Sequence, residues 1–441
     1  MNRRSILLTS LTALAMATCS IVISGCTKEG PAGKDGKDGQ DGKDGKDGTA
    51  ACISCHAPDG IELAATQYDY SKHAFGEQAY ARSGIPGCSP CHASEAFKYI
   101  CLNNVPATFT LNSATGRYAT DFVVPQSVAY GDITCSTCHS SIHATYGPGD
   151  LALTTIAPVD LNMWGGKKTI DIKADGGRSN LCIKCHQPQP ITQATDGNVL
   201  NYEALAANPG GIIFSPESSN NLIIPQYRTH PHYGTTGAIF AGVGGVEFPG
   251  VAYENSVHTR ATSCQDCHMA PMQGKSGGHT FFSKGNFNGC NASGCHTGVT
   301  ANSDGYWKTP RANVKAALDA LAAKLNIGGI DVLNRNPDAS HNLWAANSTN
   351  RYDGYLNIYD PVNNPSGVAD NPGGIFQNPA PAASWTQAQK DFNATLPKLT
   401  LTNAQMGAII NFQLCLRDFS LGIHNYKYTM ALLNNSINAL N

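Results

Sequence analysis

The stretch Cys264-Gln265-Asp266-Cys267-His268 decides how this sequence is interpreted. Two cysteines separated by two residues, with a histidine directly after the second, occur at five places, and a sixth copy has four residues between its cysteines. In chain order, the motifs are Cys52/Cys55/His56, Cys88/Cys91/His92, Cys135/Cys138/His139, Cys182/Cys185/His186, Cys264/Cys267/His268 and Cys290/Cys295/His296. Most of the 16 cysteines therefore belong to one repeated pattern.

This pattern is the one that covalent haem attachment requires. The two thiols form thioethers with the haem, and the histidine that follows reaches the iron from the proximal side. Structural zinc is the competing interpretation, but zinc does not require a histidine directly after the second cysteine every time. We therefore predict about six c-type haems with their iron, held by the motif cysteines and histidines. The longer spacing between Cys290 and Cys295 predicts a wider loop with the same purpose.

The first residues have the features of a targeting segment. Arg3 and Arg4 precede an apolar stretch, which ends in Ile23-Ser24-Gly25-Cys26, a pattern typical of a bacterial lipoprotein. We expect residues 1–25 to be a signal peptide and Cys26 to carry the lipid anchor; an ordinary signal peptide cut elsewhere is the alternative. The sequence thus predicts an exported protein held at the outer membrane or cell surface by lipid alone, with the periplasmic face as a second option.

A glycine recurs at every third position from Gly30 to Gly48. This period is the collagen signature, but the tract is short and nearly lacks proline. We interpret residues 26–48 as a hydrated tether, with a local trimer as the alternative.

The rest of the chain divides by motif content. Residues 49–300 contain all six motifs and are expected to form the multihaem domain, whereas residues 301–441 contain none and are expected to form a helical region that packs on it. The predicted fold class is mainly α with extensive loops and minor β-hairpins, built around a packed chain of haems. A net charge of −2 gives no reason to expect nucleic acid as a partner.

Four secondary-structure elements can be predicted by range. Residues 108–111 and 118–124, separated by a polar turn, predict a hairpin. Apolar residues at helical spacing predict a helix over 313–326. Thr402 and Gln405 resemble a capping box for a helix that runs to about residue 420. A last helix is expected to begin near His424, after Gly422.

Eight histidines lie outside the motifs, which is enough for a second imidazole on every haem iron. Such bis-His ligation gives low-potential iron suited to electron transfer. Methionine is the rival ligand, and we favour histidine.

Several segments resemble the multihaem cytochromes of dissimilatory metal-reducing bacteria and their relatives, a group that also resembles ammonia-forming cytochrome c nitrite reductase. The segments are Ser71-Lys-His73, His232-Tyr-Gly, Gly242-Val-Gly-Gly-Val-Glu-Phe-Pro-Gly250, Tyr253-Glu-Asn-Ser-Val-His258, Gly278-His279-Thr-Phe281 and Gly422-Ile-His424-Asn425. The resemblance covers about residues 50–100 and 225–441 and is specific in the second span. It implies that His73, His232, His258, His279 and His424 are distal ligands.

His143 is our sixth distal candidate, because it lies just past the third motif and can reach a neighbouring haem. His230 and His341 are expected to be bystanders.

The resemblance implies electron transfer at the cell surface. The expected partners are other cytochromes or an outer-membrane porin–cytochrome complex, with an Fe(III) or Mn(IV) oxide as the external acceptor. A reductase of nitrite, hydroxylamine or a sulfur oxyanion, with one open haem, is a second hypothesis. The nitrite reductases, however, have lysine in place of the histidine in their catalytic motif, and every motif here ends in histidine. A subunit of a cytochrome filament is a third hypothesis.

Cys101 and Cys415 remain after the motif cysteines, the lipid cysteine and Cys19 of the signal peptide. In an oxidising compartment they can form a disulfide, or they can stay as free thiols. The sequence does not choose between these two states.

Overall fold

The chain divides into two units, residues 1–49 and 50–441. All residues that the computed structural model describes belong to the second unit. They are 55–76, 81–112, 117–144, 148–191, 202–211, 229–292, 294–327, 330–335, 352–356 and 401–441. The predicted signal peptide, the lipid cysteine Cys26, the tether, Cys52 and His341 lie outside the described residues.

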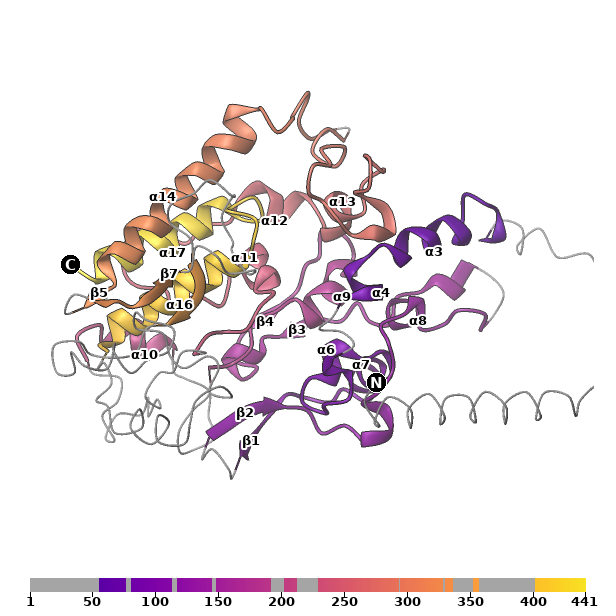
Figure 1. Cartoon of the computed structure of the whole chain (residues 1–441), viewed down its shortest axis with the longest axis horizontal. Helices are drawn as coiled ribbons and strands as arrows, with labels where there is room; N and C mark the ends of the chain where they lie inside the picture. The colour runs from indigo at the N-terminus through magenta and orange to yellow at the C-terminus, as the bar shows by residue number, and fades with distance from the viewer. Residues whose placement is uncertain are drawn as a thin grey trace, which may run out of the picture. The chain divides into compact units, whose positions relative to one another are not determined.

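The described part is mostly helical, with short helices in its first half and longer ones near its end (Figure 1). The helices of the first half are α3 (Ile61–Asp69), α4 (Lys72–Phe75), α6 (Ser89–His92), α7 (Ser94–Leu102), α8 (Cys135–Cys138), α9 (Arg178–Cys185) and α10 (Tyr202–Ala207). Those of the second half are α11 (Thr236–Ala241), α12 (Val257–Ala261), α13 (Cys264–His268), α14 (Thr309–Lys324), α16 (Asn403–Arg417) and α17 (Tyr426–Ala439). This agrees with the predicted mainly α class.

Short 3-10 helical turns and one π-helical turn, η5, also occur in the described residues. They are η1 (Gln126–Val128), η2 (Pro148–Leu151), η3 (Asn162–Trp164), η4 (Gly278–Thr280) and η5 (Asp304–Lys308).

The strands form antiparallel two-stranded hairpins and no larger sheet within the described ranges. They are β1 (Thr108–Asn112) with β2 (Arg117–Asp121), β3 (Val159–Asp160) with β4 (Thr169–Ile170), β5 (Asn326–Ile327) with β6 (Ile330–Asp331), and β7 (Leu333–Arg335) with β8 (Tyr352–Leu356). The first of them confirms the predicted hairpin, with Thr108 opposite Asp121.

The three predicted C-terminal helices are present with shifted ends. Helix α14 begins four residues before the predicted range, and it buries the predicted face that includes Val314, Leu318 and Leu321. The capping box of α16 is confirmed, since Thr402 and Gln405 exchange both hydrogen bonds, at 2.8 and 3.2 Å. Helix α17 begins two residues after His424, because the Asn425 side chain caps it.

Helices α14, α16 and α17 pack against one another (Figure 1) and share one core with residues from 159 to 248. Every residue of α16 except Gln405 is buried, so this helix lies in the interior rather than on a face. Its polar side chain Asn411 accepts a hydrogen bond from the backbone N–H of Val246 and donates to the carbonyl of the same residue, both at 2.8 Å. The C-terminal region is therefore joined to the loop after α11 by buried hydrogen bonds as well as by apolar packing.

Replacing Asn411 by alanine is expected to lower the free energy of unfolding by about 2 kcal/mol, because the N–H and carbonyl of Val246 lose their partner inside the core. Denaturant unfolding measures this change. Asn438→Ala, at an exposed position of α17, is the matched control and should shift stability by no more than about 0.5 kcal/mol. Equal losses in the two variants would contradict the proposed role of Asn411.

Candidate paired-histidine sites

Motifs 2 to 6, in which both cysteines are described, each place their cysteines and histidine on one short turn of chain. In three motifs the histidine N–H donates to the carbonyl of the first cysteine, at 3.2 Å for His92, 2.9 Å for His139 and 2.9 Å for His186. The longer motif closes the same bond, from His296 to the Cys290 carbonyl at 2.9 Å. The two additional residues are therefore absorbed in a wider loop, as the sequence predicted.

Motif 1 is described only from Cys55 onward. Its first cysteine, Cys52, lies outside the described residues, so the predicted pairing of Cys52 and Cys55 on one turn stays a prediction. Cys55 itself is a half-buried free thiol. The chain folds back directly after it, since a Cβ atom at Gly60 would lie 2.6 Å from the Cys55 carbonyl oxygen. The attachment of a haem at Cys55 stays a prediction.

The described motif cysteines share two properties: none of them forms a disulfide, and all are at least partly exposed as residues. They are Cys55, Cys88, Cys91, Cys135, Cys138, Cys182, Cys185, Cys264, Cys267, Cys290 and Cys295. The predicted thioethers therefore stay predictions for each of them. The two cysteines outside the motifs, Cys101 and Cys415, are also free thiols, and Cys415 is buried within α16.

Side chains at the motif ends stabilise two of these turns. Ser263 and Asp266 form a capping box at the start of α13. Thr134 and Thr137 form one at the start of α8. Each box satisfies backbone N–H groups that the first turn of a helix leaves without a partner, so the start of the motif is held in place.

The histidine rings form facing pairs, each of which joins one motif histidine to one histidine outside the motifs. Four ring pairs have centroids about 6 Å apart: His56–His143 at 5.9 Å, His186–His73 at 6.0 Å, His296–His258 at 6.1 Å and His268–His424 at 6.2 Å.

The remaining two motif histidines, His92 and His139, each interact by charge with a histidine outside the motifs. Burial, together with the nearby charges of His232 and Arg82, lowers the pKa of His92 to about 4. Burial likewise lowers the pKa of His279, and His139 adds to this effect. Four of the six predicted distal histidines thus form a ring pair with a motif histidine, and the other two, His232 and His279, interact by charge with His92 and His139. That they bind iron stays a prediction.

We number the pairs by the motif that supplies the first histidine. Site 1 is His56–His143, site 2 is His92–His232, site 3 is His139–His279, site 4 is His186–His73, site 5 is His268–His424 and site 6 is His296–His258.

The ring separations suit a metal ion between the rings. A metal–imidazole bond is about 2 Å long and the ring centroid lies about 1 Å behind the nitrogen, so two imidazoles on opposite sides of one ion have centroids about 6 Å apart. Two rings in direct contact can have other centroid separations, whereas two imidazoles on one metal ion must have a separation of about 6 Å. No group of three or more His, Cys, Asp or Glu arranged to hold a metal ion occurs among the residues described.

Hydrogen bonds at the Nδ1 atoms orient several of these rings. The Nδ1–H of His139 donates to the Leu151 carbonyl at 2.8 Å, that of His258 to the Ile423 carbonyl at 2.9 Å, and that of His268 to the Phe281 carbonyl at 2.9 Å. In this tautomer the lone pair is on Nε2, which is the arrangement that metal-binding histidines use. Burial also lowers the pKa of His73 and His268, which favours the neutral form that binds metals.

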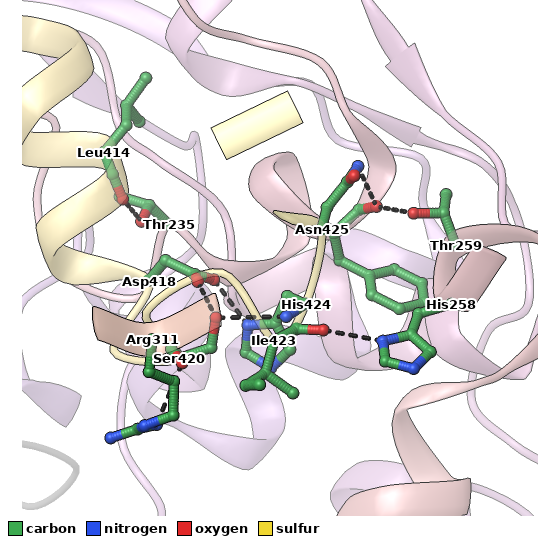
Figure 2. Close-up of polar contacts among 11 residues, drawn as sticks. Thr235, His258, Thr259, Arg311, Leu414, Asp418, Ser420, Ile423, His424 and Asn425 are labelled. Carbon is green, nitrogen blue, oxygen red and sulfur yellow. Dashed lines mark hydrogen bonds and ion pairs between the residues drawn. The ribbon is translucent and has the colours of Figure 1, made fainter. Parts of the chain in front are cut away.

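His424 differs from the others because its Nδ1 faces a carboxylate, Asp418 Oδ1, at 2.6 Å (Figure 2). Burial alone would lower the pKa of His424, but the charge and hydrogen bond of Asp418 raise it above its usual value. Because Asp418 accepts the Nδ1–H, Nε2 is the ring atom that is left to bind a proton or a metal ion. Ser420 also donates to Asp418 and so holds the carboxylate in place (Figure 2).

Sites 5 and 6 are joined through one short segment. Figure 2 shows the His258 ring bonded to the carbonyl of Ile423, the residue before His424. The loop between α16 and α17 thus positions histidines of two different sites.

Two of the predicted distal histidines have left-handed backbone conformations, His143 with φ 60° and His232 with φ 67°. This conformation costs a residue other than glycine about 1 kcal/mol or more in conformational free energy. Such strained residues are concentrated at functional sites. The strained backbone agrees with a role for these two side chains beyond packing.

Sequence reasoning missed two supporting residues. Asp418 is six positions before His424, and no motif marks it. Phe281 lies with its ring 5.0 Å from that of His73 and 5.9 Å from that of His279. The Nδ1 of the predicted bystander His230 is 2.7 Å from the buried guanidinium of Arg417.

No family model, curated protein or solved structure matches this chain. Across the described ranges, none of the helices combines the length and the apolar character needed to cross a membrane.

Proposed function

We propose that this chain is an electron-transfer protein that holds about six c-type haems, each attached at one motif and ligated by one histidine pair. The observation that carries the proposal is the pairing of histidines: four motif histidines have a non-motif histidine ring about 6 Å away, and the other two, His92 and His139, interact by charge with His232 and His279. A bis-His haem iron supplies one-electron chemistry at low potential and offers no open position to a substrate. The pairing therefore favours electron transfer over a reductase.

In this proposal the residues have separate tasks. The cysteines hold the cofactor covalently, the paired imidazoles saturate the metal, and the Nδ1 hydrogen bonds keep each ring oriented and adjust its basicity. The resemblance of residues 225–441 to cytochromes of metal-reducing bacteria supports a place at the outer membrane or cell surface. There the chain would take electrons from a reduced cytochrome partner and pass them to an Fe(III) or Mn(IV) oxide.

The test is a haem count combined with the spin state of the oxidised protein. We expect the intact mass to show six attached haems, and electron paramagnetic resonance to show only low-spin iron, because two imidazoles bind each ion. Fewer than five haems would overturn the proposal. One high-spin iron among six would instead mean an open site and would favour the reductase hypothesis.

Asp418 is expected to lower the potential of site 5. An anionic acceptor on Nδ1 makes His424 more basic and so stabilises ferric iron. Weakening this bond by about 1 kcal/mol in Asp418→Asn should raise one of the midpoint potentials by about 40 mV. Spectroelectrochemical titration measures the shift. Asp304→Asn, at an exposed position, is the control and should leave all potentials unchanged. A titration curve of Asp418→Asn that overlays the wild-type curve would contradict this role.

A further inference from the structure

The motifs of sites 2, 3 and 4 meet around Cys185. Its thiol is hydrogen-bonded to that of Cys91, and Cys185 Sγ lies 4.0 Å from the Pro90 carbonyl of motif 2. Motif 3 is joined to α9, which carries motif 4, through residues 154–156: the Thr154 N–H donates to the Cys138 carbonyl at 2.8 Å, and Asn180 of α9 donates to the Ile156 carbonyl at 3.1 Å. Since cysteines mark the edge at which each haem is attached, three attachment edges come together here.

Two further contacts support this meeting point. Motifs 2 and 3 touch directly, because the Thr137 hydroxyl donates to Ser94 Oγ at 2.8 Å within a buried contact. On the other side, a Cβ atom at Gly234, two residues after His232, would lie 3.6 Å from Nδ1 of His186. The motif side of site 2 therefore lies near site 3, and its His232 side lies near site 4.

Site 4 also contacts site 5. The thiols of Cys182 and Cys264 are hydrogen-bonded to each other. The Cys264 N–H donates to Ser179 Oγ of α9 at 3.0 Å. Phe281 strengthens the connection, since its ring contacts His73 of site 4 and its carbonyl accepts from His268 of site 5.

From site 5 the contacts continue to site 6. The backbones of motifs 5 and 6 touch where a Cβ atom at Gly289 would lie 2.3 Å from the Asp266 carbonyl oxygen. The His258–Ile423 hydrogen bond joins the distal sides of the two sites.

Site 1, by contrast, adjoins site 3. Its second histidine, His143, follows the motif 3 histidine His139 by four residues. Helix α3, which follows motif 1, is bonded to the same region: Tyr68 donates to the Ile133 carbonyl, and Gln67 accepts from the His279 N–H at 2.9 Å.

We propose that the six sites form a three-armed electron path whose arms meet at sites 2, 3 and 4, rather than a single file in the order of the motifs. One arm leads through site 3 to site 1, the second leads through sites 4 and 5 to site 6, and the third is site 2 itself. The inference rests on the proposed function. The three arms therefore end at sites 1, 2 and 6.

The chain thus has three points at which redox partners can dock, and it can distribute electrons between two acceptors or collect them from two donors. In every hop one electron leaves a ferrous site, which becomes ferric, and reduces the neighbouring ferric site. A reduced cytochrome supplies the electrons, and a metal oxide or a second cytochrome takes them. Site 1 is the arm end nearest in sequence to the triplet tract.

The arms can be tested by removing one site at a time from the holoprotein. All variants are made in a background that carries His143→Met and Cys101→Ser. The His143→Met substitution gives site 1 a distinct optical band and a raised potential, so site 1 serves as the reporter of electron arrival. The background also carries Ala301→Cys, labelled with a ruthenium photoreductant to inject electrons near site 6. Removing site 2 with Cys88→Ser and Cys91→Ser should leave reduction of the reporter as fast as in the background. Removing site 4 with Cys182→Ser and Cys185→Ser should abolish it within the lifetime of the injected electron.

Loss of reporter reduction on removal of site 2, or its persistence on removal of site 4, would overturn the three-armed path. If a variant does not retain five haems by mass, the iron positions in an experimental structure of the wild-type holoprotein decide. We expect the irons of sites 2, 3 and 5 to lie around that of site 4. Six irons in single file would refute the junction alone, whereas a wild-type protein without haem would refute the proposed function itself.

Discussion

His73→Ala is expected to convert one of six low-spin irons to high-spin, because alanine cannot replace the imidazole that faces His186 with a centroid separation of 6.0 Å. The opened position should bind carbon monoxide in the reduced protein, with about one sixth of the haem absorbance responding. Electron paramagnetic resonance and carbon monoxide difference spectra measure both changes. Since site 4 lies at the junction of the proposed path, transfer to site 6 should also slow.

His230→Ala is the matched control for this substitution. His230 is two residues from a distal candidate, and its Nδ1 lies 2.7 Å from Arg417, so we expect all irons to stay low-spin. A carbon monoxide response in His230→Ala, or an unchanged spectrum in a six-haem His73→Ala protein, would mean that the pairing of site 4 is wrong.

Gly289→Ala is expected to cost about 3 kcal/mol in the free energy of unfolding, because the added Cβ atom would lie 2.3 Å from the Asp266 carbonyl oxygen and 3.1 Å from Cys267 Cα. Both contacts are with backbone, which cannot rotate away as a side chain can. Motifs 5 and 6 must then separate, so the potentials of sites 5 and 6 should change together. Denaturant unfolding and redox titration measure these effects.

Gly305→Ala provides the matched comparison, since no atom lies within 4 Å of its added Cβ atom. This variant should retain wild-type stability to within about 0.5 kcal/mol. If Gly289→Ala were as stable as Gly305→Ala, the close contact between motifs 5 and 6 would be refuted.

The local elements could be predicted well from the sequence. The capping box at Thr402 and the hairpin at Thr108 depend on residues a few positions apart, and both are present. Element ends were less accurate: α14 begins at Thr309 rather than Asn313, since Pro310 is accommodated in its first turn. Helix α17 begins after His424 because Asn425 provides the cap.

The candidate site could be predicted as a set of residues but not as an arrangement. Sequence reasoning selected the four non-motif histidines whose rings the structure pairs with motif histidines, and two more that interact with motif histidines by charge. It did not assign them to partners: His73 precedes motif 2 yet pairs with His186 of motif 4, and His279 follows motif 5 yet interacts by charge with His139 of motif 3. Asp418 was not foreseen, because its importance depends only on the fold of the loop before His424.

The sequence by itself determined the number of cysteine–histidine motifs and the geometry within each of motifs 2 to 6, because a cysteine pair and its histidine lie on one turn of chain and depend on spacing alone. The tertiary structure decided which histidines face each other and which motifs touch. These contacts join residues far apart in the chain, and they depend on how α9, α13 and the loop before α17 pack, which no local spacing specifies.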